Sequence, residues 1–197
     1  MVVYKGVILY NANYIPTMVY NCDNRLKKQE FAEEYMIELR KIDSENVWNV
    51  IKLSVDVEQE NFVATNTESI IEAFTTITSG GVALPFGIYD DGCLVGFVMF
   101  GYGTTGDEDE PAIAQNNYCI WRFMIDKKYQ HQGIGRKALL ASLQYLGSMP
   151  CGKAEYCWLS YEPENIIAKK LYSTEGFYEN GEMCEDEIVS VLRLHKN

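Results

Sequence analysis

The sequence contains a strongly apolar segment, Tyr118-Cys119-Ile120-Trp121-Arg122-Phe123-Met124-Ile125, and, after four intervening residues, the glycine turn Gln130-His131-Gln132-Gly133-Ile134-Gly135. The apolar run predicts a strand, and the leucines spaced along residues 133–146 predict a helix that starts at the turn. Free N–H groups and the positive end of the helix dipole attract anions at such a helix start. Glycine lets the backbone approach a phosphate closely. The pattern therefore predicts a phosphate-binding turn.

Charge supports an anionic ligand at this turn. The chain of 197 residues carries a formal net charge of −11, which argues against nucleic acid as a partner and suits a cationic substrate. Basic residues nevertheless gather around the turn, namely Lys127, Lys128, Arg136 and Lys137. A local positive site in an acidic protein is what an anionic cofactor requires.

The length fits one globular domain with a short appendage. We expect the domain to begin near Met36 and to occupy residues 36–197, preceded by an N-terminal extension, residues 1–35, of undecided structure. The first twenty residues lack the features of a signal peptide, and no run of 18 apolar residues predicts a membrane span. We therefore expect a cytoplasmic protein that does not associate with a membrane.

The cysteines and histidines do not form a metal motif. Six cysteines are scattered without a C-x-x-C pair, and the only histidines are His131 and His195. This spacing cannot assemble a zinc site, and reduced thiols in a reducing compartment are expected. We expect no metal.

The hydrophobic pattern alternates between strands and helices and predicts a mixed α/β (α+β) fold. The predicted elements are a strand at 36–40, a helix starting at 44–47, a helix capped by Asn66 or Thr67, a hairpin over 86–102 with its turn at 90–92, strands at 118–125 and 155–160, a helix over 133–146, a helix opened by Pro163 and closed by Gly176, and two last strands, the second at 188–194.

Three other readings of the glycine turn can be weighed. A kinase-type phosphate loop requires G-x-x-x-x-G-K-[ST], which the chain lacks. The string from Gly133 to Ala138 satisfies the dinucleotide fingerprint G-x-G-x-x-A, and Glu155 lies at a suitable distance beyond it. However, only about 60 residues remain for the further strand–helix units that this fold needs. An ordinary tight turn is the third alternative.

The motif Gln130-x-x-Gly133-x-Gly135, preceded by the strand end Phe123-Met124-Ile125-Asp126, resembles the signature of the GNAT superfamily of N-acetyltransferases. The resemblance continues from Leu159 through Asn165 to Phe177 and covers the chain from about Met36 to its end. Within the superfamily, three segments look most like the spermidine/spermine (diamine) acetyltransferases: Trp121–Asp126, Ser160–Asn165 and Gln59–Ala64.

The resemblance implies a mixed, mostly antiparallel twisted sheet of about six to seven strands flanked by about four helices. Acetyl-CoA would bind where two central parallel strands splay apart. It implies an acetyl-CoA-dependent N-acetyltransferase that moves the acetyl group to a primary amine of a small polyamine or diamine by direct attack in a ternary complex. A homodimer is compatible with the superfamily. Alternatives are another acceptor amine (a protein N-terminus, lysine, amino acid or antibiotic) and a non-catalytic acyl-CoA sensor on the same fold.

The resemblance also implies roles for individual residues. The residues expected to bind the cofactor are Met124, Ile125, Gln130, His131, Gln132, Gly133, Ile134, Gly135, Arg136, Lys137, Asn165, Lys169 and Tyr172. A backbone N–H near Met124 or Ile125 would bind the acetyl carbonyl, and Tyr172 would protonate the leaving thiolate. Asn165 has an alternative role as a bond to its own helix backbone.

Acceptor residues are less well marked. The catalytic candidates are thus Tyr172, Ile125 and Glu162, with Glu162 as the group that accepts the amine proton. The residues expected to bind the substrate are Asp56, Glu60, Trp121 and Glu162. The acidic run Asp107–Glu110 is either a solvated surface loop, which we favour, or a clamp for a polycation.

Overall fold

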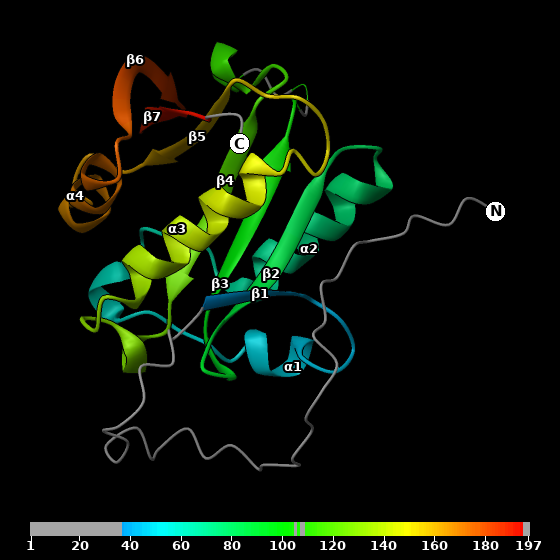
Figure 1. The fold of residues 1–197 in the computed structure, drawn as a ribbon, viewed down its shortest axis with the longest axis vertical. Helices are drawn as coiled ribbons and strands as arrows, with labels where there is room; N and C mark the ends of the chain where they lie inside the picture. Colours follow the sequence, from blue (N-terminus) through cyan, green and yellow to red (C-terminus); the bar gives the residue numbers. More distant parts are fainter. Residues whose placement is uncertain (1–36, 105, 107–108, 195–197) are drawn as a thin grey trace. The chain divides into compact units, whose positions relative to one another are not determined.

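A computed structural model describes residues 37–104, 106 and 109–194 of the chain (Figure 1). The predicted extension 1–35 and the boundary at Met36 lie outside the described residues. The same holds for Asp107, Glu108 and His195.

The described residues form one seven-stranded sheet with the order β1-β2-β3-β4-β5-β7-β6. Its strands are β1 Ile37–Lys41, β2 Ala83–Asp90, β3 Cys93–Tyr102, β4 Tyr118–Ile125, β5 Tyr156–Tyr161, β6 Tyr178–Cys184 and β7 Glu187–Arg193. Only β4 and β5 pair in parallel; all other neighbours in this sheet are antiparallel. The predicted mixed, mostly antiparallel sheet is confirmed.

Four α-helices accompany the sheet within the described ranges: α1 Val47–Val50, α2 Asn66–Thr78, α3 Ile134–Gly147 and α4 Ile166–Thr174. Short 3-10 turns are η1 Val57–Gln59, η2 Ala112–Ala114 and η3 Lys127–Tyr129. None of the helices in these ranges has both the length and the apolar character needed to traverse a bilayer.

The core has one layer on each face of the sheet. Tyr145 of α3 packs against Phe86 and Phe100 with ring centroids 5.0 and 5.6 Å apart, and Figure 1 shows α3 in front of the sheet. Met99, the neighbour of Phe100 in β3, belongs instead to a buried cluster with Val50 of α1 and residues of α2. Successive side chains of a strand point to opposite faces, so β3 serves both layers.

The β2–β3 hairpin follows the prediction closely. Asp90 pairs with Cys93, which leaves Asp91 and Gly92 as a two-residue turn. Both turn residues have positive φ, 51° and 74°. This is the conformation that Asp-Gly favours because the twist of such a turn matches that of the strands.

Two helix starts differ from the predictions. Thr65, and not Asn66 or Thr67, caps α2: its hydroxyl accepts from the N–H of Glu68, whose carboxylate accepts from the N–H of Thr65. Glu68 supplies the return bond of a capping box, which the prediction overlooked. Asn66 is buried and donates to the carbonyl of Val50, tying α2 to α1.

The helix α4 begins later than predicted. Pro163 was expected at its first position, but the helix starts at Ile166 and Asn165 is the N-cap. The Asn165 side chain accepts from the N–H of Ala168 at 3.1 Å, so a capping side chain overrides the preference of proline for a first turn. Gly176, with φ of 94°, follows the helix end as predicted.

The parallel pair β4 and β5 separates almost at once. Its ladder consists of Tyr118 with Cys157 and Cys119 with Trp158. Beyond these pairs, Ile120–Ile125 runs along β3 but pairs with no residue of β5 in the described structure. One edge of a central strand is therefore left open at the predicted place.

A close approach of β3 to β4 maintains this arrangement and can be tested at Gly96. A Cβ atom there would collide with the carbonyl oxygen of Met124 and lie 2.9 Å from Cδ1 of Ile125. We expect Gly96→Ala to lower the free energy of unfolding by about 1–3 kcal/mol, as overpacking does. Urea denaturation measures this change.

Gly101→Ala is the matched control on the same strand, because its Cβ would meet its nearest atoms at 3.7 Å. We expect it to change stability much less than Gly96→Ala. Equal effects of the two substitutions would show that β-strand propensity, and not the contact with β4, is responsible.

Candidate active site

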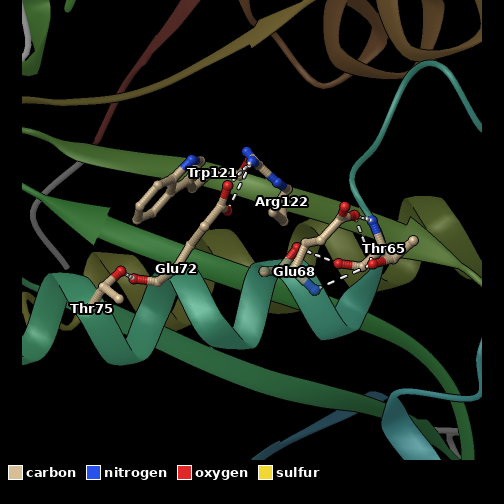
Figure 2. Close-up of polar contacts among 7 residues, drawn as sticks. Thr65, Glu68, Glu72, Thr75, Trp121 and Arg122 are labelled. Atoms are coloured by element: carbon tan, nitrogen blue, oxygen red, sulfur yellow. Dashed lines mark hydrogen bonds and ion pairs between the residues drawn. The ribbon is translucent and has the colours of Figure 1, made fainter.

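A β-bulge interrupts β4 at the centre of the open edge. Met99 pairs with Arg122, but the next β3 residue, Phe100, pairs with Ile120, so Trp121 is an extra residue in β4. Trp121 packs on the core cluster under α2, and Arg122 reaches Glu72 of α2. Two successive side chains therefore lie on one face, as Figure 2 shows, where a regular strand would alternate them.

Arg122 joins the bulge to α2. Its Nη2 donates to both carboxylate oxygens of Glu72 at 3.2 and 3.0 Å, and its Nη1 donates to the carbonyl of Trp121 at 2.9 Å (Figure 2). The guanidinium carbon lies 5.6 Å from the centre of the Trp121 ring. A two-oxygen contact of this kind holds the orientation of both partners, because the guanidinium is planar.

The last residues of β4 present their peptide groups to opposite sides. The carbonyl of Met124 points at Gly96 in β3. Because the peptide groups of consecutive strand residues point to alternate sides, those of Ile125 face away from β3. For the carbonyl of Ile125 this orientation is confirmed by Gln130, whose side-chain amide donates to Ile125 O at 2.9 Å. The same amide also donates to Oε1 of Gln59 at 2.8 Å. Of the two predicted oxyanion donors, the N–H of Ile125 is the one oriented toward the open edge.

The glycine turn adopts the conformation that its residues predict. His131 and Gly133 have φ of 60° and 76°, in the left-handed region, and Gly133 immediately precedes α3. The first N–H groups of a helix lack intrahelical partners, so those of α3 are available to a ligand. The side chain of Gln132 donates to Lys128 O at 3.2 Å, which braces the turn.

Gly135, the second glycine of the turn, is half-buried. A Cβ there would meet Ile125 at 3.8 Å and Leu171 at 4.0 Å, so this residue lies between the end of β4 and α4. Ile134, which was predicted as a cofactor contact, has its side chain buried in the core. Lys137 is exposed beside the turn.

Three predicted cofactor side chains already have protein partners. Nε of Arg136 donates to Glu175 at 2.6 Å, and Lys169 pairs with Glu179 at 2.8 Å. The pKa of Lys169 is raised, first by the hydrogen bond to Glu179. Asn165 caps its own helix, which is the alternative role that the sequence allowed.

Tyr172 is buried where β4 and β5 separate. Its ring centroid lies 6.0 Å from that of Tyr161 and 5.8 Å from that of Phe177. Burial raises its pKa well above the ordinary value, and the nearby Cys157 and Glu187 raise it further. A phenol with this pKa stays protonated throughout the neutral range, so Tyr172 can donate a proton there.

A cleft of about 380 Å³ opens between α2, the bulge of β4 and the β6–β7 turn. Its walls carry five carboxylates, two indole rings and one cation. In chain order, the lining residues are Glu72, Val82, Gly101, Tyr102, Gly103, Thr104, Asp109, Glu110, Cys119, Trp121, Arg122, Trp158, Ser160, Cys184, Glu185 and Glu187. The cleft is therefore strongly acidic.

Only one of the four predicted acceptor residues lines this cleft, and it is Trp121. Asp56 and Glu60 flank Gln59, which contacts Gln130 at the other end of β4. Glu162 follows β5 outside the cleft wall. Its pKa is raised by burial and then by the neighbouring Glu187, Glu164 and Asp186.

Part of the acidic loop after β3 lies beside the cleft. Asp109 is exposed and Glu110 is half-buried, and both line the cleft, while Asp107 and Glu108 lie outside the described residues. An oxygen of Glu110 also accepts from the N–H of Gly106 at 3.1 Å. The sequence does not show which side of the molecule a loop covers, because that depends on the strands between which it runs.

Three cleft residues, Ser160, Glu187 and Trp158, are not among the predicted site residues. The hydroxyl of Ser160 in β5 donates to Oε2 of Glu187, the first residue of β7. Trp158 is 6% exposed, and its indole N–H has no partner among the described residues. The pairing of β5 with β7 brings Glu187 to Ser160, and no local motif marks it.

Two cysteines, Cys119 and Cys184, line the cleft. None of the five cysteines of the described ranges is joined to another of them by a disulfide. Burial raises the pKa of the Cys157 thiol. In the same ranges, no group of three or more His, Cys, Asp or Glu side chains is placed to hold a metal ion.

The ion pair of Arg136 and Glu175 allows a test of whether Arg136 stabilises the fold, binds the cofactor, or does both. The Glu175 side chain is 6% exposed and the Arg136 side chain 60%. We expect Arg136→Met to lower the free energy of unfolding by about 1 kcal/mol, since water screens the exposed partner but the carboxylate is left unpaired.

Adding Glu175→Gln to Arg136→Met should restore most of that stability in urea denaturation. If Arg136 also contacts the cofactor, the double variant should keep a raised Kd for acetyl-CoA in calorimetry. A wild-type Kd in the double variant would remove Arg136 from the cofactor contacts.

Comparison of the chain with known proteins identifies its family. The sequence profile described as "Acetyltransferase (GNAT) family" matches residues 50–177. The spermine/spermidine N(1)-acetyltransferase of Bacillus subtilis (strain 168) is 41% identical over 101 residues, which are 50% of this chain and 62% of that protein. A probable spermine N(1)-acetyltransferase of Bacillus subtilis subsp. natto is 42% identical over 101 residues, which are again 50% of this chain and 62% of that protein. The match thus spans about three fifths of the length of these relatives.

Solved structures share the fold at low identity. The PaiA N-acetyltransferase of Thermoplasma acidophilum, in complex with coenzyme A, has a TM-score of 0.55 and 17% identity over 80% of this chain and 98% of that one. The spermidine N-acetyltransferase of Vibrio cholerae, in complex with CoA and spermine, has a TM-score of 0.57 and 16% identity over 82% and 97%. The family profile matches well over half of the residues of this chain, and the chain therefore belongs to the acetyltransferase (GNAT) family.

Proposed function

We propose that the protein is an acetyl-CoA-dependent N-acetyltransferase that acetylates a primary amine of a small polyamine, by direct attack in a ternary complex. The observation that carries the acceptor assignment is the acidic cleft beside the open edge of β4. The names of the Bacillus subtilis relatives support the same acceptor class.

The donor would bind along the open edge of β4. The pyrophosphate would sit on the N–H groups at the start of α3, next to Gly133 and Lys137. The pantetheine arm would extend beside β4 toward the point where β4 and β5 separate. The thioester carbonyl would accept a hydrogen bond from the N–H of Ile125, which would stabilise the negative charge that develops on this oxygen.

The acceptor would occupy the cleft on the α2 side of the bulge. Its carboxylates attract ammonium groups, and an attraction of this kind weakens as salt screens it. The indole rings of Trp121 and Trp158 offer apolar surface to the methylene segments between the nitrogens, and an indole face also attracts cations.

The reaction needs a neutral amine, an oxyanion donor and an acid for the leaving thiolate. The amine nitrogen attacks the thioester carbon, the tetrahedral intermediate collapses and the C–S bond breaks. Tyr172 is the proposed proton donor to sulphur, because it is buried beside the end of β5 and a phenol is protonated at neutral pH.

A second acceptor class is favoured by a specific observation. The Nε of Arg122 and the indole N–H of Trp158 are buried donors without a partner among the described residues, in a cleft whose wall carries five carboxylates. An amine that also carries a carboxylate or carbonyl, such as an amino acid or a peptide N-terminus, would satisfy them.

A thiol-release assay with acetyl-CoA distinguishes these assignments. We expect turnover with spermidine, spermine and putrescine and little with an amino acid, a lysine peptide or an aminoglycoside. Turnover restricted to a non-polyamine amine would overturn the acceptor assignment. Binding of acetyl-CoA without turnover of any amine would indicate a sensor.

Tyr172→Phe tests the proposed acid. Phenylalanine preserves the ring packing against Tyr161 and Phe177, so the fold and the Kd for acetyl-CoA should be unchanged. We expect kcat to fall by about 100-fold, within the usual range for loss of a proton-transfer group. Steady-state kinetics measure this change, and an unchanged kcat would exclude Tyr172 as the acid.

A further inference from the structure

We propose that Glu187, oriented by Ser160, receives the acceptor ammonium and removes its proton. This inference rests on the proposed acetyltransferase function and assigns a catalytic residue to its acceptor side. It replaces Glu162, the base expected from the sequence, with a residue of the cleft wall.

The pairing of β7 with β5 and β6 fixes the position of Glu187. It is the first residue of β7, it pairs with Cys184 at the end of β6, and its neighbours in β7 pair with the end of β5. The carboxylate of Glu187 lines the cleft and accepts a hydrogen bond from the hydroxyl of Ser160. Ser160 lines the same cleft. One oxygen is thereby held in place, and the carboxylate remains in contact with the space where an amine would bind.

Glu187 and the proposed acid both lie by the end of β5. Tyr172 packs on Tyr161, the last residue of β5, with ring centroids 6.0 Å apart, and Tyr161 pairs with Ile188, the residue after Glu187. The charge of Glu187 is also among those that raise the pKa of Tyr172. An acyl transfer needs a base beside the attacking nitrogen and an acid beside the leaving sulphur. Glu187 on the cleft side and Tyr172 on α4 supply this arrangement around one position.

Other carboxylates of the cleft are less suited to the role. Both oxygens of Glu72 accept from Arg122, and Glu110 accepts from the N–H of Gly106. Glu185 lies in the exposed turn between β6 and β7, with φ of 51°. Glu162 is outside the cleft wall, although its pKa responds to the charge of Glu187.

The proton balance of the reaction is complete with these groups. The ammonium loses one proton to Glu187, which releases it to water, and the neutral nitrogen forms the C–N bond. The C–S bond breaks and Tyr172 protonates sulphur, while the second nitrogen proton leaves to solvent and a solvent proton restores Tyr172. The products are the acetylated amine, the thiol of coenzyme A and one proton.

The test compares Glu187→Gln with the wild-type full-length chain. Glutamine keeps an oxygen that can accept from Ser160, so the thermal midpoint and the Kd for acetyl-CoA should stay unchanged. At pH 7 we expect kcat to fall by about 100-fold or more. The activity of the variant should rise about tenfold per pH unit toward the pKa of the free amine, near 10, because only the neutral fraction then reacts.

Two further variants give the comparison its controls. Asp186→Asn removes a carboxylate from the same exposed turn but from outside the cleft lining, and its kcat should stay within about threefold of the wild type, as a solvated surface charge contributes little. Ser160→Ala leaves the Glu187 carboxylate but removes its donor. It should lower kcat less than Glu187→Gln does, without the steep rise in activity with pH.

The outcomes separate the two proposals. All variants are assayed on whichever amine the wild-type chain acetylates, so turnover of a non-polyamine overturns the acceptor assignment alone. A wild-type kcat and pH profile in Glu187→Gln overturns the role of Glu187 alone. Equal losses in Glu187→Gln and Asp186→Asn also overturn it, because they would reflect only the negative charge of this turn. Absence of turnover with every amine overturns both.

Discussion

The separation of β4 from β5 after two residue pairs is the constraint on which the rest of the site depends. A central strand normally satisfies its peptide groups on both sides, and a buried group left unpaired is costly. Here one edge of β4 is open between two structured halves of the sheet. A ligand with amide groups along its length can complete that edge, as the pantetheine arm of acetyl-CoA would.

The bulge in β4 connects this open edge to the acceptor side. By adding Trp121, it turns two neighbouring side chains toward α2, and the contact of Arg122 with Glu72 fixes α2 against the strand (Figure 2). The strand then resumes its alternation, so that Ile125 faces Gly135 and the N–H of Ile125 faces away from β3. One irregularity thus provides both a cleft wall and a strand end with the orientation that the chemistry needs.

The two sides of the candidate site differ in how far the sequence specifies them. The glycine turn, the start of α3 and Tyr172, the proposed proton donor on α4, lie in continuous segments whose residue types specify the local backbone. Of the residues that the sequence suggested for the acceptor, Trp121 lines the cleft, and Asp56, Glu60 and Glu162 lie outside it. An acidic residue carries no local signature of its role, since most carboxylates of a soluble protein are simply solvated.

Local rules therefore account for the order of strands and helices, the hairpin turn at Asp91-Gly92 and the phosphate turn at Gly133, because φ preferences and hydrophobic period act over a few residues. They fail where two local preferences compete, as with the capping of α4 by Asn165 in place of a first turn at Pro163. Two features depend on how β5 pairs with β7. They are the residue at which β4 stops pairing with β5 and the hydrogen bond between Ser160 and Glu187. Contacts between residues far apart in the chain arise only when the sheet is assembled, so the tertiary structure alone decides the lining of the cleft that we propose for the acceptor.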